Sequence, residues 1–210
     1  MATSGVEPHF AEAAEELARR DPDLARWIEH IGPPAIRPPS DSYFAALSRS
    51  IVFQQLAGRA AAAIHGRFVA AVGGQLSPEA VLATPEADLR AAGLSANKFL
   101  SLRDLSQRVI NGEVPLDDLD SLADDDIVAR LSAVRGIGRW TAEMFLIFQL
   151  RRPDVWPVDD LGVRRGYAVI HGLAEWPKPK QLMELGDRYR PFRTVAAWYC
   201  WRTADTVLPE

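Results

Sequence analysis

Two adjacent acids, Asp159 and Asp160, stand in the stretch WPVDDLGVRRGY, between a proline and a run with helical character. An ionised carboxylate can stabilise developing positive charge, and it can orient or deprotonate an attacking water. Upstream, Gly136 and Gly138 interrupt a helical pattern in VRGIGRWT. Two such glycines permit positive φ and let backbone amides at a helix start point at an anion. The simpler alternatives are a tight turn between helices and, for one acid, a helix cap or a salt bridge to a following arginine.

The elements that must position these residues are predicted to be helices. Ser77, Thr84, Ser95 and Asp124 each precede a helical pattern and are expected to be N-caps. No segment shows sustained period-two alternation, so a substantial sheet is not expected. Four prolines make residues 31–40 a linker. Helices are predicted over these ranges: about 8–30, two within 41–73, 78–83, 85–92, 96–110, 124–132, and an apolar one from 139.

Composition limits the classes of protein. The 210 residues, 48% of them hydrophobic, suffice for one good core or two small ones. A net charge of −4 argues weakly against nucleic acid as a partner, although bases outnumber acids after residue 130. The single cysteine, Cys200, excludes an internal disulfide framework and a four-cysteine zinc or iron–sulfur site.

The chain shows no sign of membrane insertion or secretion. No stretch approaches the roughly 18 uninterrupted apolar residues of a membrane span, and the N-terminus is too acidic for a secretion signal. We therefore expect no membrane partner. The expected location is the cytoplasm, at the nucleoid, in a bacterium and the nucleus in a eukaryote.

Several motifs occur together and in order over residues 43–201. They are LSRSIVFQQLAGRAAAAI, GLSANKFLSL, VRGIGRWTAEMFLIF and PFRTVAAWYCW, with the aspartate pair between the last two. This set resembles the helix–hairpin–helix superfamily of DNA glycosylases, and within it the 3-methyladenine DNA glycosylase II branch. The resemblance implies an all-α fold with two helical subdomains and an active-site cleft between them. We place one subdomain at 41–152, with the hairpin, and the other at 1–40 plus 153–210.

The resemblance also implies a base-excision-repair enzyme. Such an enzyme flips an alkylated purine of the 3-methyladenine or 7-methylguanine type out of duplex DNA and hydrolyses its N-glycosidic bond. The N-alkylated purine is a cationic leaving group, so a single carboxylate can suffice where ordinary glycosidases need two. Two alternatives remain open: a glycosylase for other damaged or mismatched bases, and a non-catalytic DNA-binding module.

The family's aspartate opens a helix and is followed at the third position by Val or Ile. Counting from Asp160 puts Val163 at that place, whereas counting from Asp159 puts Gly162 there. The preceding Pro157 would favour Asp159 instead. We assign the catalytic role to Asp160.

The resemblance further implies where the base and the DNA bind. At the position of Trp140, bifunctional members of the superfamily have a lysine, which attacks the sugar. This chain has no such amine there, so it is expected to use water and to leave an abasic site. Residues expected to line an aromatic pocket for a cationic base are Trp140, Met144, Trp201, Trp198, Tyr43 and Phe44, of which all except Met144 are also candidates for the core. Met144 departs from the bacterial relative, which has tyrosine there.

DNA contacts are expected from two segments. The loop Gln54-Gln55-Leu56 matches the family's wedge segment, and Leu56 is expected to fill the gap left by a flipped base; its alternative is a core position. Contacts to a phosphate are expected from the backbone amides of Gly136 and Gly138, with added contacts from the side chains of Arg135 and Arg139.

The family also implies an alkali cation, Na⁺ or K⁺, on the carbonyls of Ser132, Val134 and Gly136. No cofactor is expected to be required, and no iron–sulfur cluster. Double-stranded DNA with damaged bases is the expected partner, and the protein is expected to be a monomer.

Overall fold

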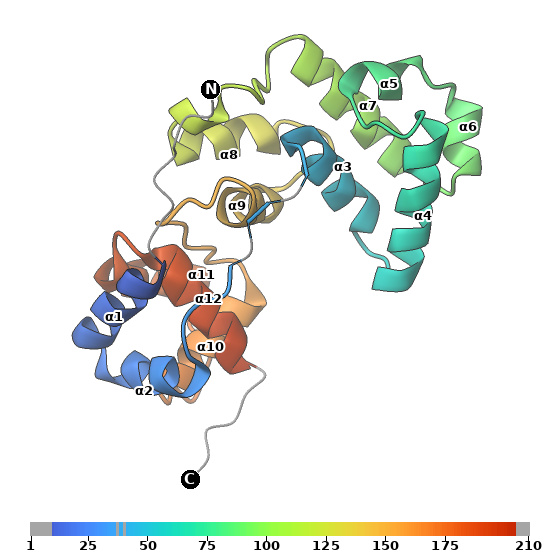
Figure 1. Cartoon of the computed structure of the whole chain (residues 1–210). Helices are drawn as coiled ribbons and strands as arrows, with labels where there is room; N and C mark the ends of the chain where they lie inside the picture. The colour runs from blue at the N-terminus through green and yellow to red at the C-terminus, as the bar shows by residue number, and fades with distance from the viewer. Residues whose placement is uncertain (1–9, 37, 40, 205–210) are drawn as a thin grey trace. The chain divides into compact units, whose positions relative to one another are not determined.

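The computed structural model describes residues 10–36, 38–39 and 41–204. Residues 1–9 and 205–210, which belong to the predicted second subdomain, and positions 37 and 40 of the predicted linker lie outside the described residues. The described chain is helical and contains no strand, which confirms the predicted all-α class (Figure 1). Within that part of the chain, no helix is both long and apolar enough to cross a bilayer.

The chain forms two compact units. We call residues 39–145 the central unit, and residues 1–38 with 146–210 the terminal unit. Helix α9 (Arg139–Phe148) begins in the central unit and ends in the terminal unit.

The central unit is built around its longest helix. Helix α7 packs against three others, α3, α5 and α6, and buries Leu102 and Leu105 completely. Its predicted cap is confirmed, since Ser95 Oγ accepts from the Lys98 amide at 3.3 Å. The helices of this unit before α9 are α3 (Tyr43–Phe53), α4 (Gly58–Ala71), α5 (Pro78–Ala83), α6 (Glu86–Ala91), α7 (Ala96–Ile110), η1 (Leu119–Ser121) and α8 (Asp124–Ser132).

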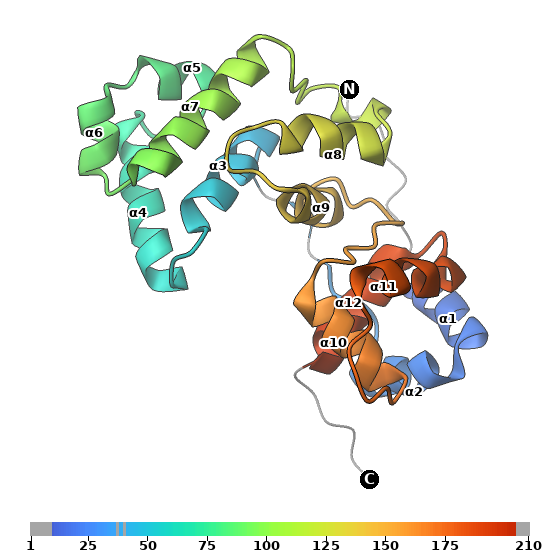
Figure 2. The same cartoon turned by 180° about the vertical axis from the view of Figure 1, so that it is seen from behind.

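The terminal unit is built from helices near the N-terminus and helices near the C-terminus. Figures 1 and 2 show α10 and α12 side by side, with α1 and α2 beside them. Its core includes Leu17, Trp27, Val163, Tyr167 and Tyr199. The elements are α1 (Phe10–Arg20), α2 (Pro22–Ile31), α10 (Leu161–Ile170), α11 (Pro179–Leu185), η2 (Gly186–Tyr189) and α12 (Arg193–Ala204).

The single helix predicted over about 8–30 is wrong, because the chain breaks at Asp21. Asp21 Oδ1 accepts from the amides of Asp23 and Leu24 at 3.1 and 3.2 Å, and Pro22 stands at the first position of α2. Proline fits a helix start and does not fit a helix interior, so the Asp-Pro pair ends α1 and begins α2.

Close packing of α10 on α12 depends on a glycine. A Cβ at Gly166 would overlap the backbone of Cys200, so only glycine lets the two helices come this near. Cys200 is buried in that contact. This packing fixes the helix that follows the aspartate pair.

The segment between α9 and α10 is anchored to the start of α12. Thr194 Oγ1 donates to the Arg152 carbonyl at 2.6 Å and accepts from the Val155 amide at 3.0 Å. Arg193 binds the Asp154 carboxylate with two nitrogens, at 2.7 and 2.9 Å. These contacts set the path by which the chain enters α10.

Candidate functional site

The hairpin of residues 134–138 is held in a defined shape. Gly136 has φ +78°, and the Ile137 amide donates to the Val134 carbonyl at 3.1 Å. Ile137 is buried while both glycines are exposed. A Cβ on Gly136 would lie 2.6 Å from Ser101 Oγ, so the turn lies directly on α7. The exposed turn at the start of α9 has the form expected of an anion site.

Arg135 is bound to α7 through its backbone and its side chain. Its amide donates to Asp104 Oδ2 at 2.7 Å, and its Nη2 donates to Asn97 Oδ1 at 3.3 Å. The Arg135 amide is thus bound to a carboxylate. The amides predicted to bind a phosphate are those of the two glycines, Gly136 and Gly138. On the other side of the turn, Arg139 Nε lies 2.9 Å from the buried Glu143 carboxylate.

The loop between α3 and α4 presents the predicted wedge. Leu56 is 39% exposed, which excludes the alternative that it is a core residue. Gln55 has φ +57°, a left-handed conformation that costs about 1–3 kcal/mol for a residue other than glycine. Three hydrogen bonds hold the loop: Gln54 Nε2 donates to the Gly136 carbonyl at 2.8 Å, and Lys98 Nζ donates to the Val52 and Gln54 carbonyls at 2.6 and 2.9 Å.

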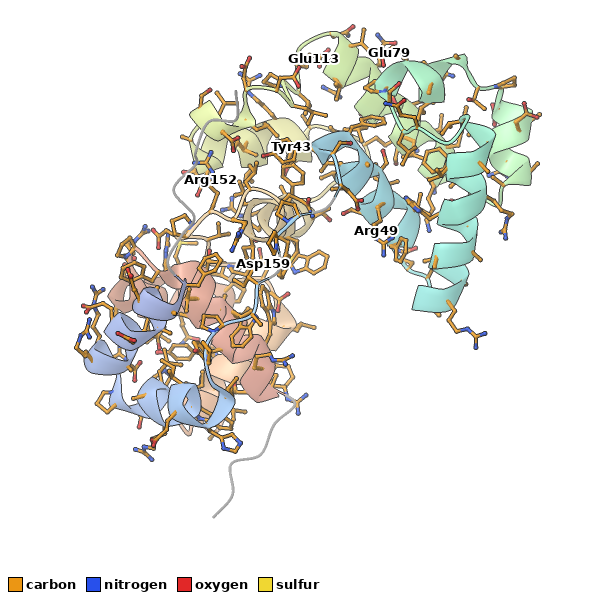
Figure 3. All side chains as sticks on the ribbon, viewed as in Figure 1. Tyr43, Arg49, Glu79, Glu113, Arg152 and Asp159 are labelled. Atoms are coloured by element: carbon orange, nitrogen blue, oxygen red, sulfur yellow. The ribbon has the colours of Figure 1, made fainter. Side chains whose placement is uncertain are left out.

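The predicted base-pocket residues of the central unit differ in exposure. Trp140 is 50% exposed and Met144, one turn later on α9, is half-buried. Tyr43, labelled in Figure 3, stands at the beginning of α3. Its ring packs edge-on against that of Phe145, with centroids 5.5 Å apart. Phe44 is buried and belongs to the core of the unit. Trp140, which composition alone would assign to the core, is therefore on the surface.

Asp160 is the N-cap of α10. Its Oδ1 accepts from the Val163 amide and from Trp201 Nε1, both at 2.9 Å. Asp159 is exposed, and its side chain is labelled in Figure 3. The helix-cap role that the sequence left for the other acid thus belongs to Asp160, whose carboxylate is oriented by two donors.

An aromatic pair accompanies this aspartate in the terminal unit. The rings of Trp201 and Phe148 are stacked, with centroids 5.8 Å apart and planes at 26°. A Cβ at Gly162 would lie 2.8 Å from Trp201 Cδ1, so glycine makes room for the indole. Trp198 is 9% exposed and belongs to the core, where it contacts Tyr199 edge-on.

The carbonyls predicted to hold an alkali cation are partly engaged. Gly136 O accepts from Gln54 and Val134 O accepts from the Ile137 amide. A carbonyl oxygen has two lone pairs, so one hydrogen bond leaves the second available to a cation. The cation remains a prediction from the resemblance.

Sequence patterns did not predict some of the contacts that shape the site. Gln54, Lys98 and Asp104 act through bonds to backbone groups distant in the chain, which no local pattern reveals. Gly162 and Gly166 carry a usable signal, because a four-residue glycine spacing on a helix often marks close packing against another element.

Known proteins share this fold and these motifs. Residues 48–191 match the family model of the HhH-GPD superfamily base excision DNA repair protein. DNA-3-methyladenine glycosylase 1 of Schizosaccharomyces pombe is 40% identical over 161 residues, which cover 75% of this chain and 71% of that protein.

Two solved structures are also similar. One is a 3-methyladenine DNA glycosylase of S. pombe in complex with abasic DNA, with a TM-score of 0.78, 35% identity, and coverage of 93% of this chain and 97% of that one. The other is a DNA-3-methyladenine glycosidase of Bacillus halodurans, with a TM-score of 0.85, 35% identity, and coverage of 98% and 92%. Together with the match of the family model over most of the sequence, these similarities show that the chain belongs to the HhH-GPD superfamily of base excision DNA repair proteins.

Proposed function

We propose that this protein is a monofunctional DNA glycosylase that hydrolyses the N-glycosidic bond of alkylated purines in duplex DNA and leaves an abasic site. The observation that carries the proposal is the Asp160 carboxylate, held at the start of α10 by the Val163 amide and the Trp201 indole. The names of the similar proteins, DNA-3-methyladenine glycosylases, support the substrate class.

Asp160 supplies the charge that the reaction needs. As the bond to the base breaks, positive charge develops on the sugar, and a fixed carboxylate stabilises this transition state more than the ground state. The same carboxylate can orient a water for attack on the anomeric carbon. Because an alkylated purine leaves as a neutral base, no acid is needed to protonate it.

Water is the nucleophile in this proposal. Covalent catalysis through a Schiff base requires an amine. The position at which bifunctional members carry lysine is Trp140, whose exposed indole offers a ring face for a cationic base. A hydrolytic reaction ends at an abasic site without cutting the strand.

DNA is the partner, and the central unit supplies two elements for it. The hairpin amides at Gly136 and Gly138 bind a phosphate, and the exposed Leu56 enters the duplex in place of the flipped base. The S. pombe relative in complex with abasic DNA supports this assignment of the partner.

The test is a glycosylase assay on duplexes that each carry one lesion: 3-methyladenine, 7-methylguanine, 1,N6-ethenoadenine or hypoxanthine. We expect release of at least one alkylated base, with strand breaks that appear only after alkali. Absence of abasic sites from every lesion would refute the alkylated-base proposal. Strand cleavage without alkali would refute a monofunctional mechanism.

A further inference from the structure

The wedge loop and the hairpin are both fastened to one helix, α7. Lys98 reaches the wedge loop, at the carbonyls of Val52 and Gln54. Asp104 reaches the hairpin, at the Arg135 amide. Residues three and four apart share one face of a helix, so Lys98, Ser101 and Asp104 form one continuous contact surface.

Lys98 stabilises a strained chain reversal. Helix α3 ends at Phe53, and the following residues leave the helical conformation, with Gln55 at φ +57°. An ammonium group that binds the last carbonyls of a helix satisfies unpaired acceptors and interacts favourably with the helix dipole. Burial lowers the pKa of Lys98 from its ordinary value. The half-buried ammonium is held in this place by its two carbonyl acceptors.

Gln54 completes the connection. Its backbone carbonyl accepts from Lys98, and its side-chain amide donates to the carbonyl of Gly136 in the hairpin. One residue thus touches both the lysine that holds the wedge loop and the turn that is proposed to bind phosphate. Leu56 lies two residues further on.

We propose that Lys98 is a positioning residue for base flipping, which fixes Leu56 relative to the hairpin so that phosphate binding and wedge insertion occur as one event. This inference rests on the proposed function. A wedge in a fixed position enters the duplex without first paying the entropy of ordering its loop. Lys98 touches neither substrate nor the reacting atoms in this scheme.

The test compares Lys98→Met with Lys98→Arg and with Lys180→Met, a matched loss of charge at an exposed lysine on α11. Single-turnover excision is measured for one alkylated base, first paired and then placed in single-stranded DNA. For Lys98→Met we expect a rate about 10- to 100-fold lower on the paired lesion and less than about 3-fold lower on the unpaired one, which needs no wedge. Lys98→Arg should restore most of the rate, and Lys180→Met should match the wild type.

A double-mutant cycle separates positioning from general stability. In a Leu56→Ala background, Lys98→Met should change the paired-lesion rate by less than about 2-fold, because its effect passes through Leu56. A full additional loss in that background would overturn the proposal, as would equal losses on paired and unpaired lesions. If Lys98→Met lowers the melting temperature, Gln54→Ala serves in its place, with the same expected and overturning results.

A second readout does not require catalysis. Fluorescence of 2-aminopurine placed next to a stable abasic analogue reports destacking when the wedge enters. Wild type should raise this signal and Lys98→Met should not, at equal DNA occupancy. A rise in fluorescence with wild type but no glycosylase activity would count against the proposed function alone. A rise with Lys98→Met as large as that with wild type would count against the positioning role alone.

Discussion

Asp160 and Asp159 are neighbours in sequence and differ in their surroundings. The Asp160 carboxylate accepts two hydrogen bonds at 2.9 Å, whereas Asp159 is exposed. A carboxylate held in one orientation can meet developing charge without reorganisation, and a solvated one cannot. The chemistry at the residue scale therefore depends on orientation as much as on the presence of an acid.

Replacing each acid in turn tests this difference. Asp160→Asn removes the charge and keeps an acceptor for the two donors, so excision should fall about 10²- to 10⁴-fold while lesion binding stays within about 3-fold. Asp159→Asn should keep most of the activity. Single-turnover rates and DNA-binding titrations measure both. If Asp159→Asn alone abolishes excision, the catalytic residue has been misassigned.

The indole donor of Trp201 is a second target at this scale. Trp201→Phe keeps a ring to stack on Phe148 and loses the hydrogen bond to Asp160, so the excision rate should fall about 3- to 30-fold. Trp198→Phe, three residues earlier in the core, should lower stability by about 1–3 kcal/mol and leave the rate of the folded protein unchanged. Equal rates for Trp201→Phe and wild type would show that the bond does not orient the carboxylate.

At the scale of single helices, two N-cap residues differ in how many other residues they bind. Ser42 caps α3 through one bond to the Ala45 amide at 3.2 Å. Asp21 caps α2 and also accepts from the Tyr189 hydroxyl at 2.8 Å and from Arg188 at 3.2 Å. The second cap therefore joins the N-terminal helices to the segment that precedes α12.

This difference predicts unequal losses of stability. Asp21→Ala removes a cap and leaves a buried tyrosine hydroxyl without its acceptor, so it should cost about 2–4 kcal/mol. Ser42→Ala should cost about 1 kcal/mol. Urea denaturation of each variant gives the comparison. Similar losses for both would mean that the Tyr189 bond adds nothing.

Local signals predicted some helix caps correctly and others wrongly. Ser77 and Ser95 act as the caps that the sequence predicts. The predictions for Thr84 and Asp124 are wrong, because the Thr84 hydroxyl donates to the Ala80 carbonyl and Asp124 is the first residue of α8 rather than its cap. The break at Asp21 was missed although Asp-Pro is a start signal, because the apolar pattern continues across it. The bond from Trp201 to Asp160 could not be predicted, because it joins residues of two helices whose packing depends on Gly162 and Gly166.

At the scale of the whole molecule, stability should depend on pH through a buried histidine. His171 lies between Tyr167, whose ring centroid is 4.3 Å away, and the Tyr189 hydroxyl at 2.9 Å. Burial lowers the pKa of His171 from 6.5, and this exceeds the opposing effect of the nearby Asp21 and Asp23 carboxylates; Arg188 acts in the same direction as burial. The folded protein therefore binds the proton less readily than the unfolded chain.

Proton linkage gives the direction in which stability changes with pH. Well above pH 6.5 neither state holds the proton, so His171 contributes no pH dependence there; as the pH falls through that value, the unfolded chain gains the proton first and stability declines. The free energy of unfolding in urea should be lower at pH 5.5 than at pH 7.5. His171→Gln should reduce this difference, and His30→Gln, at an exposed position on α2, should leave it unchanged. An identical difference in His171→Gln would refute the assignment.

The buried sulfur at the contact of α10 and α12 has a practical consequence. Cys200 is the only cysteine, it is 1% exposed, and burial raises the pKa of its thiol well above its ordinary value. The thiolate is the reactive form of cysteine, so the folded protein should react very slowly with maleimide reagents. A cysteine introduced on the surface of each unit could then carry a spectroscopic probe without removal of the native one, and distances between the units could be followed in solution as DNA is added.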